Sequence, residues 1–576
     1  MTRHLMPFGA EIRPEGNTRF RLWAPAAPTV RLELPGRGTL AAMTPRPGGW
    51  HELVTEAPAG EPYRFVLPDG RAVADPASRC QLEDADGPSM VVDADAYRWR
   101  NPDWSGRPWR ETVLYELHVG TFTPEGSFAA AERRLPYLAE LGITAVELMP
   151  LAEFPGRRNW GYDGVLPFAP DRTYGTPDEL RALVDTAHGL GLMVFLDVVD
   201  NHFGPEGNFI GRYAPGFYTE DFHTPWGVAI DFRQREVRDF YLHHALCWLA
   251  EYRLDGLRFD AVHAILDPSE PHFLVELAQQ LPRHVHLVLE NERNEARFLR
   301  GDRGARQRPY DAQWHDDLHH AAHALLTGER QGYYADFADD PADRLRRTLA
   351  EGFVRTEESS TDLWPLAYVA FLQNHDQIGN RAQGERLTRL APAAAVAAAQ
   401  SLLLLSPQVP LLFMGEEWGA TTPFLYFCDF HGELAASIRE GRAREFAAFH
   451  EAAEDIPDPL AETTFAASRL DWSELEQPEH AAWLARTRSL LELRQREIVP
   501  RLAGEVRVTD SRSLGSHAFS VAWRLADGSH LTLTANLGPH PHAADLPPGR
   551  LLHATHAMHP GELPSWSVAW TLERSA

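Results

Sequence analysis

The stretch GLRFDAVHAI, residues 256–265, alternates apolar and polar residues as a β-strand does. It sets Arg258 two places before Asp260. Side chains at i and i+2 of a strand share a face, so we expect both charges to point the same way. The stretch therefore predicts a carboxylate at the end of an apolar strand with a guanidinium beside it.

The same rhythm extends along the middle of the chain, where apolar runs of strand length alternate with longer segments of helical periodicity. Eight such runs occur, at 112–120, 145–151, 193–199, 254–262, 286–292, 310–314, 368–376 and 409–419. Eight strands in this alternation predict a closed parallel (β/α)8 TIM barrel. An open, doubly wound sheet is the alternative, but it needs a Gly-rich phosphate loop after an early strand, and none is present.

The two ends of the chain read as β-structure. Residues 1–95 contain short strands and a hairpin with an Asp-Gly turn, and a second pair of strands joined by Asp-Gly follows residue 500. We therefore predict a multidomain α/β protein: an N-terminal β-sandwich resembling a carbohydrate-binding module (1–95), a catalytic barrel with inserted loops (96–498) and a C-terminal β-sandwich domain (499–576).

Composition excludes several classes of function. A net charge of −26 over 576 residues argues against nucleic acid or an anionic membrane as partner. All 55 basic residues are arginine, which excludes a lysine Schiff base and a P-loop lysine. There is no apolar run of 18 residues and no secretory signal, and the three cysteines form no C-x-x-C pattern. We therefore expect a cytoplasmic protein.

Polar residues gather where the predicted strands end, which is where the chemistry of such barrels lies. Four strands end in this way, with Asp197, Asn201 and His202, then Arg258, Asp260 and His263, then Glu290 and Glu292, and then His375 and Asp376. Any one of these residues could be a helix cap or a loop ion pair. The whole set at one end of four apolar strands predicts an active site.

Asp260 and Glu290 are 30 residues apart, about one βα unit, which places them on neighbouring strands. Carboxyls so placed could lie at the roughly 5–5.5 Å separation of retaining glycosidases. One acid then attacks the anomeric carbon while the other protonates the leaving oxygen. We expect Arg258 to hold Asp260 ionised, and a more enclosed Glu290 to keep its proton.

Two further segments carry candidate contacts. RRNWGYDG (157–164) supplies Trp160 and Tyr162, flat surfaces suited to sugar rings, although core packing is an alternative. WHDDLHHAAH (314–323) has His315, His319 and His323 at the i, i+4 spacing of metal ligands. The H-E-x-x-H order of zinc proteases is absent, and histidines also bond sugar hydroxyls, so we predict no metal and no cofactor.

Together these stretches resemble the α-amylase family of glycoside hydrolases over the whole chain. DVVDNH (197–202), GLRFDAVH (256–263), LVLENE (287–292) and QNHD (373–376) look like the four conserved regions of that family, in order. The resemblance implies Asp260 as nucleophile, Glu290 as acid/base and Asp376 as the acid that stabilises the transition state. Glu292 is the alternative acid/base. The resemblance also implies sugar contacts for Arg258, His202, His375, Tyr162, Trp160, Asp197, Asn201 and His263.

Within the family, NHFGPEGN (201–208), QNHDQIGNR (373–381) and FMGEEWG (413–419) resemble the subgroup that cuts the α-1,4 bond joining trehalose to a maltooligosaccharide. That likeness implies maltooligosyl trehalose and related α-glucans as substrates, and a functional pairing with a maltooligosyl trehalose synthase. It adds possible sugar contacts at Asp316, Asp317, His319, His320, Gln377 and Asn380. The chain departs from the family pattern at Asp200 and at Phe430, which concerns fine substrate contacts.

Two rival functions stay open from the sequence. A glycogen-branching or debranching enzyme shares the N-terminal sandwich and the set of acids. A non-catalytic glucan-binding protein could use the same scaffold, although such a protein has no use for a buried proton donor.

Overall fold

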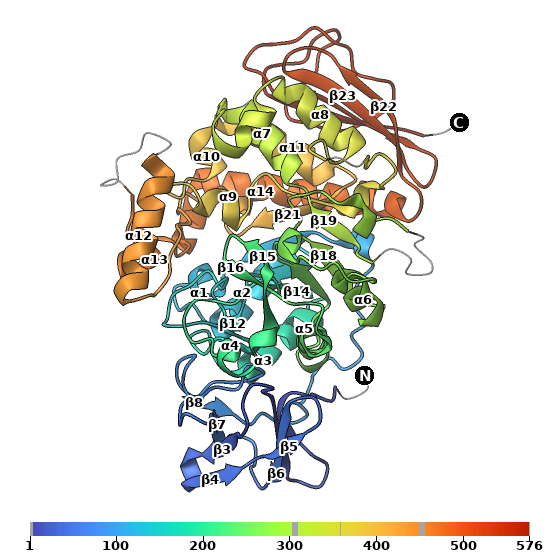
Figure 1. The fold of residues 1–576 in the computed structure, drawn as a ribbon. Helices are drawn as coiled ribbons and strands as arrows, with labels where there is room; N and C mark the ends of the chain where they lie inside the picture. The colour runs from blue at the N-terminus through green and yellow to red at the C-terminus, as the bar shows by residue number, and fades with distance from the viewer. Residues whose placement is uncertain (1–3, 302–308, 357–358, 448–455, 575–576) are drawn as a thin grey trace.

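The computed structural model describes residues 4–301, 309–356, 359–447 and 456–574. In Figure 1 the N-terminal strands lie at one end of the molecule, the barrel in the middle and the C-terminal strands at the other end. Among the described residues, no helix is both long enough and apolar enough to cross a membrane.

The N-terminal domain consists of two antiparallel sheets. One has the order β1 (Gly9–Ile12), β2 (Thr18–Trp23), β6 (Trp50–Thr55), β5 (Thr44–Arg46), and the other the order β4 (Thr39–Ala42), β3 (Arg31–Leu34), β7 (Pro62–Val66), β8 (Ala72–Val73), with β9 (Ser89–Met90) also on β7. Strand β2 alternates buried and partly exposed residues, as expected for a sheet with one face on a core. Phe20 and Leu22 supply that buried face.

The predicted barrel is confirmed. Its eight strands pair in parallel and close in the order β10 (Leu114–Leu117), β11 (Ala145–Leu148), β14 (Met193–Val198), β17 (Gly256–Phe259), β18 (His286–Leu289), β19 (Ala312–Trp314), β20 (Tyr368–Ala370) and β21 (Val409–Phe413). Each strand lies within one of the eight predicted runs. Most of their residues are buried on both faces, because helices cover the outside of the barrel and side chains fill the inside.

Helices fill most of the connections between these strands. The main ones are α2 (Phe128–Leu141), α3 (Pro177–Gly189), α5 (Arg235–Glu251), α6 (Phe273–Gln280), α7 (Asp316–Thr327), α8 (Pro341–Glu351), α11 (Ala393–Leu405) and α14 (Pro478–Leu493). Helix α11 is rich in Ala and Leu, and most of its residues are buried. Helix α2 begins after Ser127, whose side chain accepts a hydrogen bond from the Ala130 N–H, and ends at Gly142 in the left-handed conformation.

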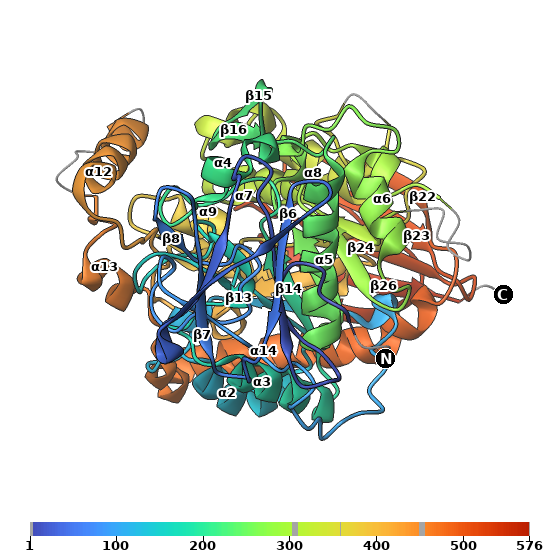
Figure 2. The ribbon, with the colours of Figure 1, turned by 60° about the horizontal axis from the view of Figure 1, so that its bottom comes forward.

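Several inserted elements have no counterpart in the sequence predictions. They are the short pair β12 (Ala152–Glu153) and β13 (Leu166–Pro170), the hairpin β15 (Tyr218–Thr224) and β16 (Gly227–Ile230), and the helices α1 (Val119–Phe122), α4 (Ile210–Tyr213), α9 (His375–Gly379), α10 (Leu387–Leu390), α12 (Gly432–Ala447) and α13 (Glu462–Ala467). In Figure 2 the β15–β16 hairpin lies at the top of the view, on the same side as α7 and α9.

The C-terminal domain is a single antiparallel sheet in the described residues. Its order is β22 (Arg507–Ser513), β23 (Ala518–Arg524), β24 (His530–Asn536), β26 (Ser567–Glu573), β25 (Arg550–Ala554). The predicted C-terminal β-domain is therefore present. Helices α8 and α11 of the barrel contact this sheet, so the facing layer is helical where a sandwich would place a second sheet.

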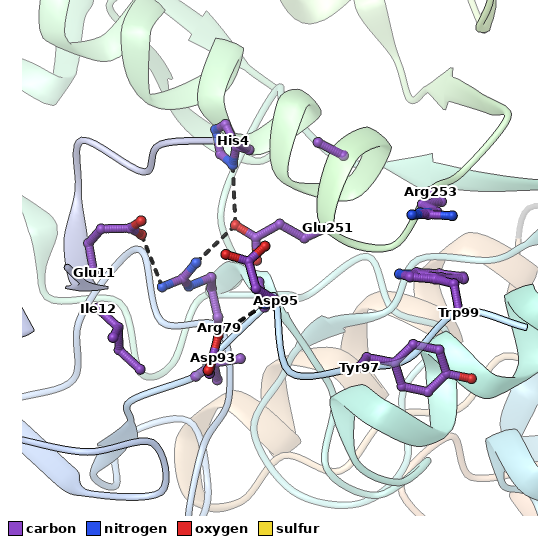
Figure 3. A pocket seen from close by; sticks show the side chains of 13 residues that line it. His4, Glu11, Ile12, Arg79, Asp93, Asp95, Tyr97, Trp99, Glu251 and Arg253 are labelled. Carbon is purple, nitrogen blue, oxygen red and sulfur yellow. Dashed lines mark hydrogen bonds and ion pairs between the residues drawn. The ribbon is translucent and has the colours of Figure 1, made fainter. Parts of the chain in front are cut away.

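Buried charges join the N-terminal domain to the barrel, as Figure 3 shows. Arg79 lies 2.9 Å from the carboxylate of Glu251 on α5 and 3.4 Å from Glu11 of β1. His4 lies 3.2 Å from the same Glu251 oxygen. These groups line an interdomain cavity of about 200 Å³, which contains none of the predicted catalytic acids.

Candidate active site

A second cavity, of about 360 Å³, opens at the carboxyl ends of the barrel strands. The structure brings most of the predicted site residues to it. The predicted residues that line it are Trp160, Tyr162, His202, Arg258, Asp260, His263, Glu290, Glu292, Asp316, His375, Asp376 and Gln377. They come from six different connections of the chain, which meet here because parallel strands present their carboxyl ends at one face.

Arg258 is the cation at the centre of this site. Its Nη1 donates to Asp260 Oδ1 at 2.8 Å and to Asp197 Oδ2 at 2.6 Å, and its Nη2 lies 3.4 Å from Glu290 Oε2. Asn201 donates from Nδ2 to the other Asp260 oxygen at 2.9 Å. Both oxygens of Asp260 thus accept from fixed donors, which restricts the rotation of the carboxylate.

The pKa of Glu290, the second acid of the pair, is raised by its surroundings. Desolvation raises its pKa to about 8; Arg258 opposes this rise, and Asp260 and Asp316 add to it. The predicted proton donor is therefore protonated at neutral pH. The expectation that Glu290 is more enclosed than Asp260 is wrong, because its side chain is 23% exposed and that of Asp260 is 11% exposed. Asp260 is the less exposed of the two acids, and it also has a fixed donor on each of its oxygens.

The backbone after Asp260 also contacts the second acid. Ala261 has φ of +40°, in the left-handed region that residues with a Cβ rarely adopt. In this conformation the Ala261 N–H donates to Glu290 Oε2 at 2.6 Å. Strain of this kind persists only where the surroundings impose it. Here the strained residue directly follows Asp260, and its N–H bonds Glu290, so the backbone connects the two acids.

Asp376 and Asp316 are two further acids that line the cavity. Asn380 donates from Nδ2 to Asp376 Oδ1 at 2.6 Å, and Gln377 donates from Nε2 to Asp316 Oδ1 at 3.5 Å. Burial raises the pKa of Asp376, and burial with the charges of Asp376 and Asp317 raises the pKa of Asp316 to about 7. Asn380 thus reaches the site through Asp376 and does not line the cavity itself.

Tyr162, His375 and Asp197 are joined by hydrogen bonds. The Tyr162 hydroxyl lies 2.7 Å from Asp197 Oδ2 and 2.9 Å from His375 Nε2, and the Tyr162 and His375 rings stack at 5.3 Å. Gly161, at φ +107°, makes the turn before Tyr162, and a Cβ there would lie 2.1 Å from the Pro150 carbonyl oxygen. Burial raises the pKa of Asp197 to about 6 against the effect of Arg258.

Aromatic residues shape the rest of the cavity. Trp226, at the β15–β16 turn, stacks on His202 with ring centroids 4.7 Å apart, and 48% of its surface is exposed. Trp160 is largely buried, and its Nε1 donates to the Leu425 carbonyl at 2.9 Å. Trp160 is thus partly core, the alternative that the sequence left open, although it also lines the cavity.

The two acids of LENE take different positions. The Glu292 side chain is 65% exposed, at the rim, where it lies 3.7 Å from His263 and 3.8 Å from Arg355. Glu290 faces Arg258 and the backbone of Ala261. The geometry therefore favours Glu290 over Glu292 as the acid/base.

Six predicted contacts do not line the cavity. Asp197, Asn201 and Asn380 each bond a residue that does. The other three are Asp317, His319 and His320. Asp317 accepts from the backbone N–H groups of Val354 and Arg355. His319 bonds the Leu372 carbonyl and the Tyr334 hydroxyl. His320 packs on aromatic rings, with Tyr333 stacked at 5.7 Å. A helix shows only one side to a cavity, and α7 shows Asp316 there while the other three face the protein.

The histidines of the 314–323 segment also diverge. His315 is buried against Tyr368 and Phe353, and His323 bonds Glu329 at 2.9 Å. Among the described residues, no group of three or more His, Cys, Asp or Glu side chains is arranged to hold a metal ion. Asp200, a departure from the family pattern, bonds His244 of α5 at 2.9 Å in the core.

Sequence reasoning missed five of the described residues that line the cavity, namely Pro225, Trp226, Ala261, Trp314 and Asn374. Arg258 stacks its guanidinium over the Trp314 ring at 4.1 Å. Trp314 ends a predicted strand, so its position was available as a signal. Trp226 carried none, because it lies in a hairpin whose place above the barrel depends on the tertiary fold.

Comparison with known proteins agrees with this geometry. Residues 120–227 match the α-amylase catalytic-domain family, and residues 507–570 match a domain of unknown function, DUF3459. A crystal structure titled as a putative α-amylase from Salmonella typhimurium is 46% identical, with a TM-score of 0.94 over 99% of this chain and all of that one.

Two curated relatives bear on the choice between subgroups. A 1,4-alpha-glucan branching enzyme of Rhizobium johnstonii is 31% identical over 297 residues, 46% of this chain and 40% of that protein. The malto-oligosyltrehalose trehalohydrolase of Deinococcus radiodurans is 44% identical over 509 residues, 85% of this chain and 83% of that protein. On this identity and coverage, the chain belongs to the malto-oligosyltrehalose trehalohydrolases of the α-amylase family.

Proposed function

We propose that this protein is a retaining glycoside hydrolase that cleaves the α-1,4 bond next to the trehalose end of maltooligosyl trehalose and releases trehalose. The observation that carries the proposal is the pair of carboxyls held beside one guanidinium in different surroundings. Asp260 has both oxygens bonded by fixed donors, and Glu290 has a pKa raised to about 8. Retaining glycosidases need this division between a nucleophile and a proton donor.

In the first step, an Asp260 oxygen attacks the anomeric carbon of the glucan while Glu290 gives its proton to the glycosidic oxygen. Trehalose leaves as a neutral alcohol, and the glucan remains bound to Asp260 as an ester. In the second step, Glu290, now a carboxylate, takes a proton from water, whose oxygen attacks the same carbon and breaks the ester. Two inversions give net retention.

The other side chains have supporting roles in this proposal. Arg258 aims Asp260 and offsets negative charge, and Asp376 stabilises the positive charge that develops on the ring. Tyr162 and Trp226 offer aromatic faces to sugar rings. His202, His263, Asp316 and Gln377 line the same cavity and can bond sugar hydroxyls.

The proposal extends to the setting of the enzyme. Its substrate has a non-reducing trehalose end, so another enzyme must rearrange the reducing end of an α-glucan, and we propose a maltooligosyl trehalose synthase as that functional partner. We also propose a cytoplasmic location, which the three unpaired cysteines support.

Product analysis tests the substrate and the stereochemistry together. We expect trehalose, and a glucan shortened by two units, from a defined maltooligosyl trehalose. NMR during the first minutes is expected to show the new reducing end as the α-anomer. The same protein given amylose distinguishes the rival, because new α-1,6 branches would support a branching enzyme, and a β-anomer would contradict retention.

Replacement of the nucleophile tests whether the protein is an enzyme or a glucan-binding protein. Asp260→Asn removes the attacking carboxylate and is expected to lower kcat by at least about 10⁴-fold, as loss of a nucleophile does elsewhere. Circular dichroism and the Tm check that the variant is folded. Unchanged turnover of maltooligosyl trehalose in the variant would overturn the assignment of Asp260.

A further inference from the structure

The buried carboxylate of Glu116, on strand β10 below the cavity, has no place in the mechanism above. Its Oε1 lies within hydrogen-bond distance of His375 Nδ1, and its Oε2 accepts from the His375 backbone N–H at 3.1 Å. Glu116 is 1% exposed and His375 is 3% exposed. Two bonds from one carboxylate to one residue, both sheltered from water, define the position of His375 closely.

The hydrogen bonds that join Tyr162 to His375 and Asp197 determine which nitrogens of His375 carry hydrogen. The Tyr162 hydroxyl has one hydrogen and two neighbours, Asp197 Oδ2 at 2.7 Å and His375 Nε2 at 2.9 Å. Asp197 Oδ2 also accepts from Arg258 Nη1 at 2.6 Å, so it is an acceptor for Tyr162 as well. The Tyr162 hydrogen therefore lies on the Asp197 side, and His375 Nε2 must donate.

The other ring nitrogen leads to the same conclusion. His375 Nδ1 faces Glu116 Oε1, an acceptor when the carboxyl is ionised. Both ring nitrogens then carry hydrogen, which makes His375 an imidazolium. If His375 were neutral, the Tyr162 and Asp197 oxygens or the Nδ1–Glu116 pair would face each other without a hydrogen between them.

The surroundings of His375 are consistent with a positive charge. Burial and Arg258 lower the pKa of His375, Glu116 and Asp376 raise it, and the net shift is upward. Two further titratable neighbours are Tyr162, whose ring stacks on it, and His118, whose pKa burial lowers to about 4. His118 is therefore neutral and does not oppose the charge on His375.

We propose that Glu116 is a positioning residue that holds His375 as an imidazolium, and that this imidazolium directs the Tyr162 hydroxyl onto Asp197 and so completes the support of Arg258 and Asp260. The functional half of this inference rests on the proposed function. The order of contacts is Glu116, His375, Tyr162, Asp197, Arg258, Asp260. A second cation beside Arg258 also reduces the cost of keeping Asp376 ionised next to it.

A matched pair of variants separates this role from the loss of any buried acid. Glu116→Gln removes the counter-ion of His375. Glu147→Gln is the control, since Glu147 lies opposite Glu116 on β11, is also 1% exposed, and has no hydrogen-bond partner for either oxygen among the described residues. Burial raises the pKa of Glu147 well above its usual value, and glutamine has nearly the same shape as a glutamic acid side chain.

The first measurement is the pH dependence of hydrolysis of maltooligosyl trehalose. In Glu116→Gln, His375 loses its proton at lower pH, so the alkaline limb of kcat/KM is expected to move down by about one pH unit or more. At neutral pH, kcat is expected to fall on the order of 100-fold, as expected for a displaced catalytic group. Glu147→Gln is expected to keep the wild-type profile, and Glu116→Asp to restore part of it.

The second measurement needs no substrate. ¹⁵N NMR of histidine-labelled protein, with His375 identified by the signal lost in His375→Asn, reports whether one or both ring nitrogens carry hydrogen at pH 7. Two protonated nitrogens in the wild type and one in Glu116→Gln support the proposal. A neutral His375 in the folded wild type, or an unchanged profile in Glu116→Gln, overturns it. An imidazolium in a protein that fails to release trehalose contradicts the proposed function and leaves the assignment of His375 intact.

Discussion

Two buried arginines hold acids in this molecule, and their surroundings differ. Arg79 joins the N-terminal domain to α5 through Glu251 and Glu11. Arg258 joins the barrel strands through Asp197 and Asp260, with Glu290 also within reach. Both guanidiniums are nearly inaccessible to water, so the cost of desolvation is similar for the two.

The pKa values of the acids beside these two arginines are shifted in opposite directions. At the domain junction, Arg79 and His4 outweigh burial and lower the pKa of Glu251 to about 2. In the cavity, one arginine faces several acids, and the pKa of Glu290 rises to about 8 while that of Asp316 rises to about 7. A structural ion pair is matched in charge, whereas a site that must store a proton carries an excess of acid.

The largest expected effect is on kcat, and it distinguishes Glu290 from its exposed neighbour Glu292. Glu290→Gln cannot transfer a proton and is expected to lower kcat by about 10²–10⁴-fold, the usual contribution of a general acid. Glu292→Gln is the control, because its exposed side chain lies at the rim, and it is expected to change kcat by less than about threefold. Steady-state hydrolysis of maltooligosyl trehalose measures both, and the reverse ranking would make Glu292 the acid.

A substitution at the domain junction is expected to lower the free energy of unfolding and to leave kcat unchanged. Arg79→Met leaves Glu251 buried with one fewer partner, and removal of one member of a buried ion pair costs about 3–5 kcal/mol. The change is expected as an earlier unfolding transition in urea, with kcat unchanged at 25 °C. Arg133→Met is the matched control, since it breaks the exposed pair with Glu125 at 2.6 Å, worth about 1 kcal/mol or less. Equal destabilisation by both variants would contradict the comparison.

The smallest effect is the pH response of the unmodified protein. Glu290 must be protonated to act, so kcat is expected to fall as pH rises through about 8, about tenfold per unit beyond it. Glu251 has a lowered pKa, so its stabilising contribution is complete above about pH 4.5 and is lost as pH falls toward 2. Activity assays and thermal unfolding at the same pH values measure the two limbs. Loss of stability near pH 8, in step with activity, would show that the alkaline limb is unfolding.

The predicted strands were found because a parallel barrel buries both faces of each strand, so each one reads as an apolar run. Asp260, Glu290 and Asp376 were found because strand ends of one direction meet at one face. The sequence alone did not distinguish Asp316, which lines the cavity, from Asp317, His319 and His320, which do not. Their side of α7 depends on how that helix packs against the Val354 backbone, the Leu372 carbonyl and the ring of Tyr333.

By itself, the amino-acid sequence determined the order of strands and helices, the end of the barrel where the acids gather, and the partnership of Arg258 with Asp260, since these depend on periodicities of two and about four residues. Only the tertiary structure decided that Trp226 reaches the cavity, that Glu116 bonds His375 from a strand far away in the chain, and that Glu290 is more exposed than Asp260. Those properties depend on distances between segments and on the local balance of charge and water, which no local pattern encodes.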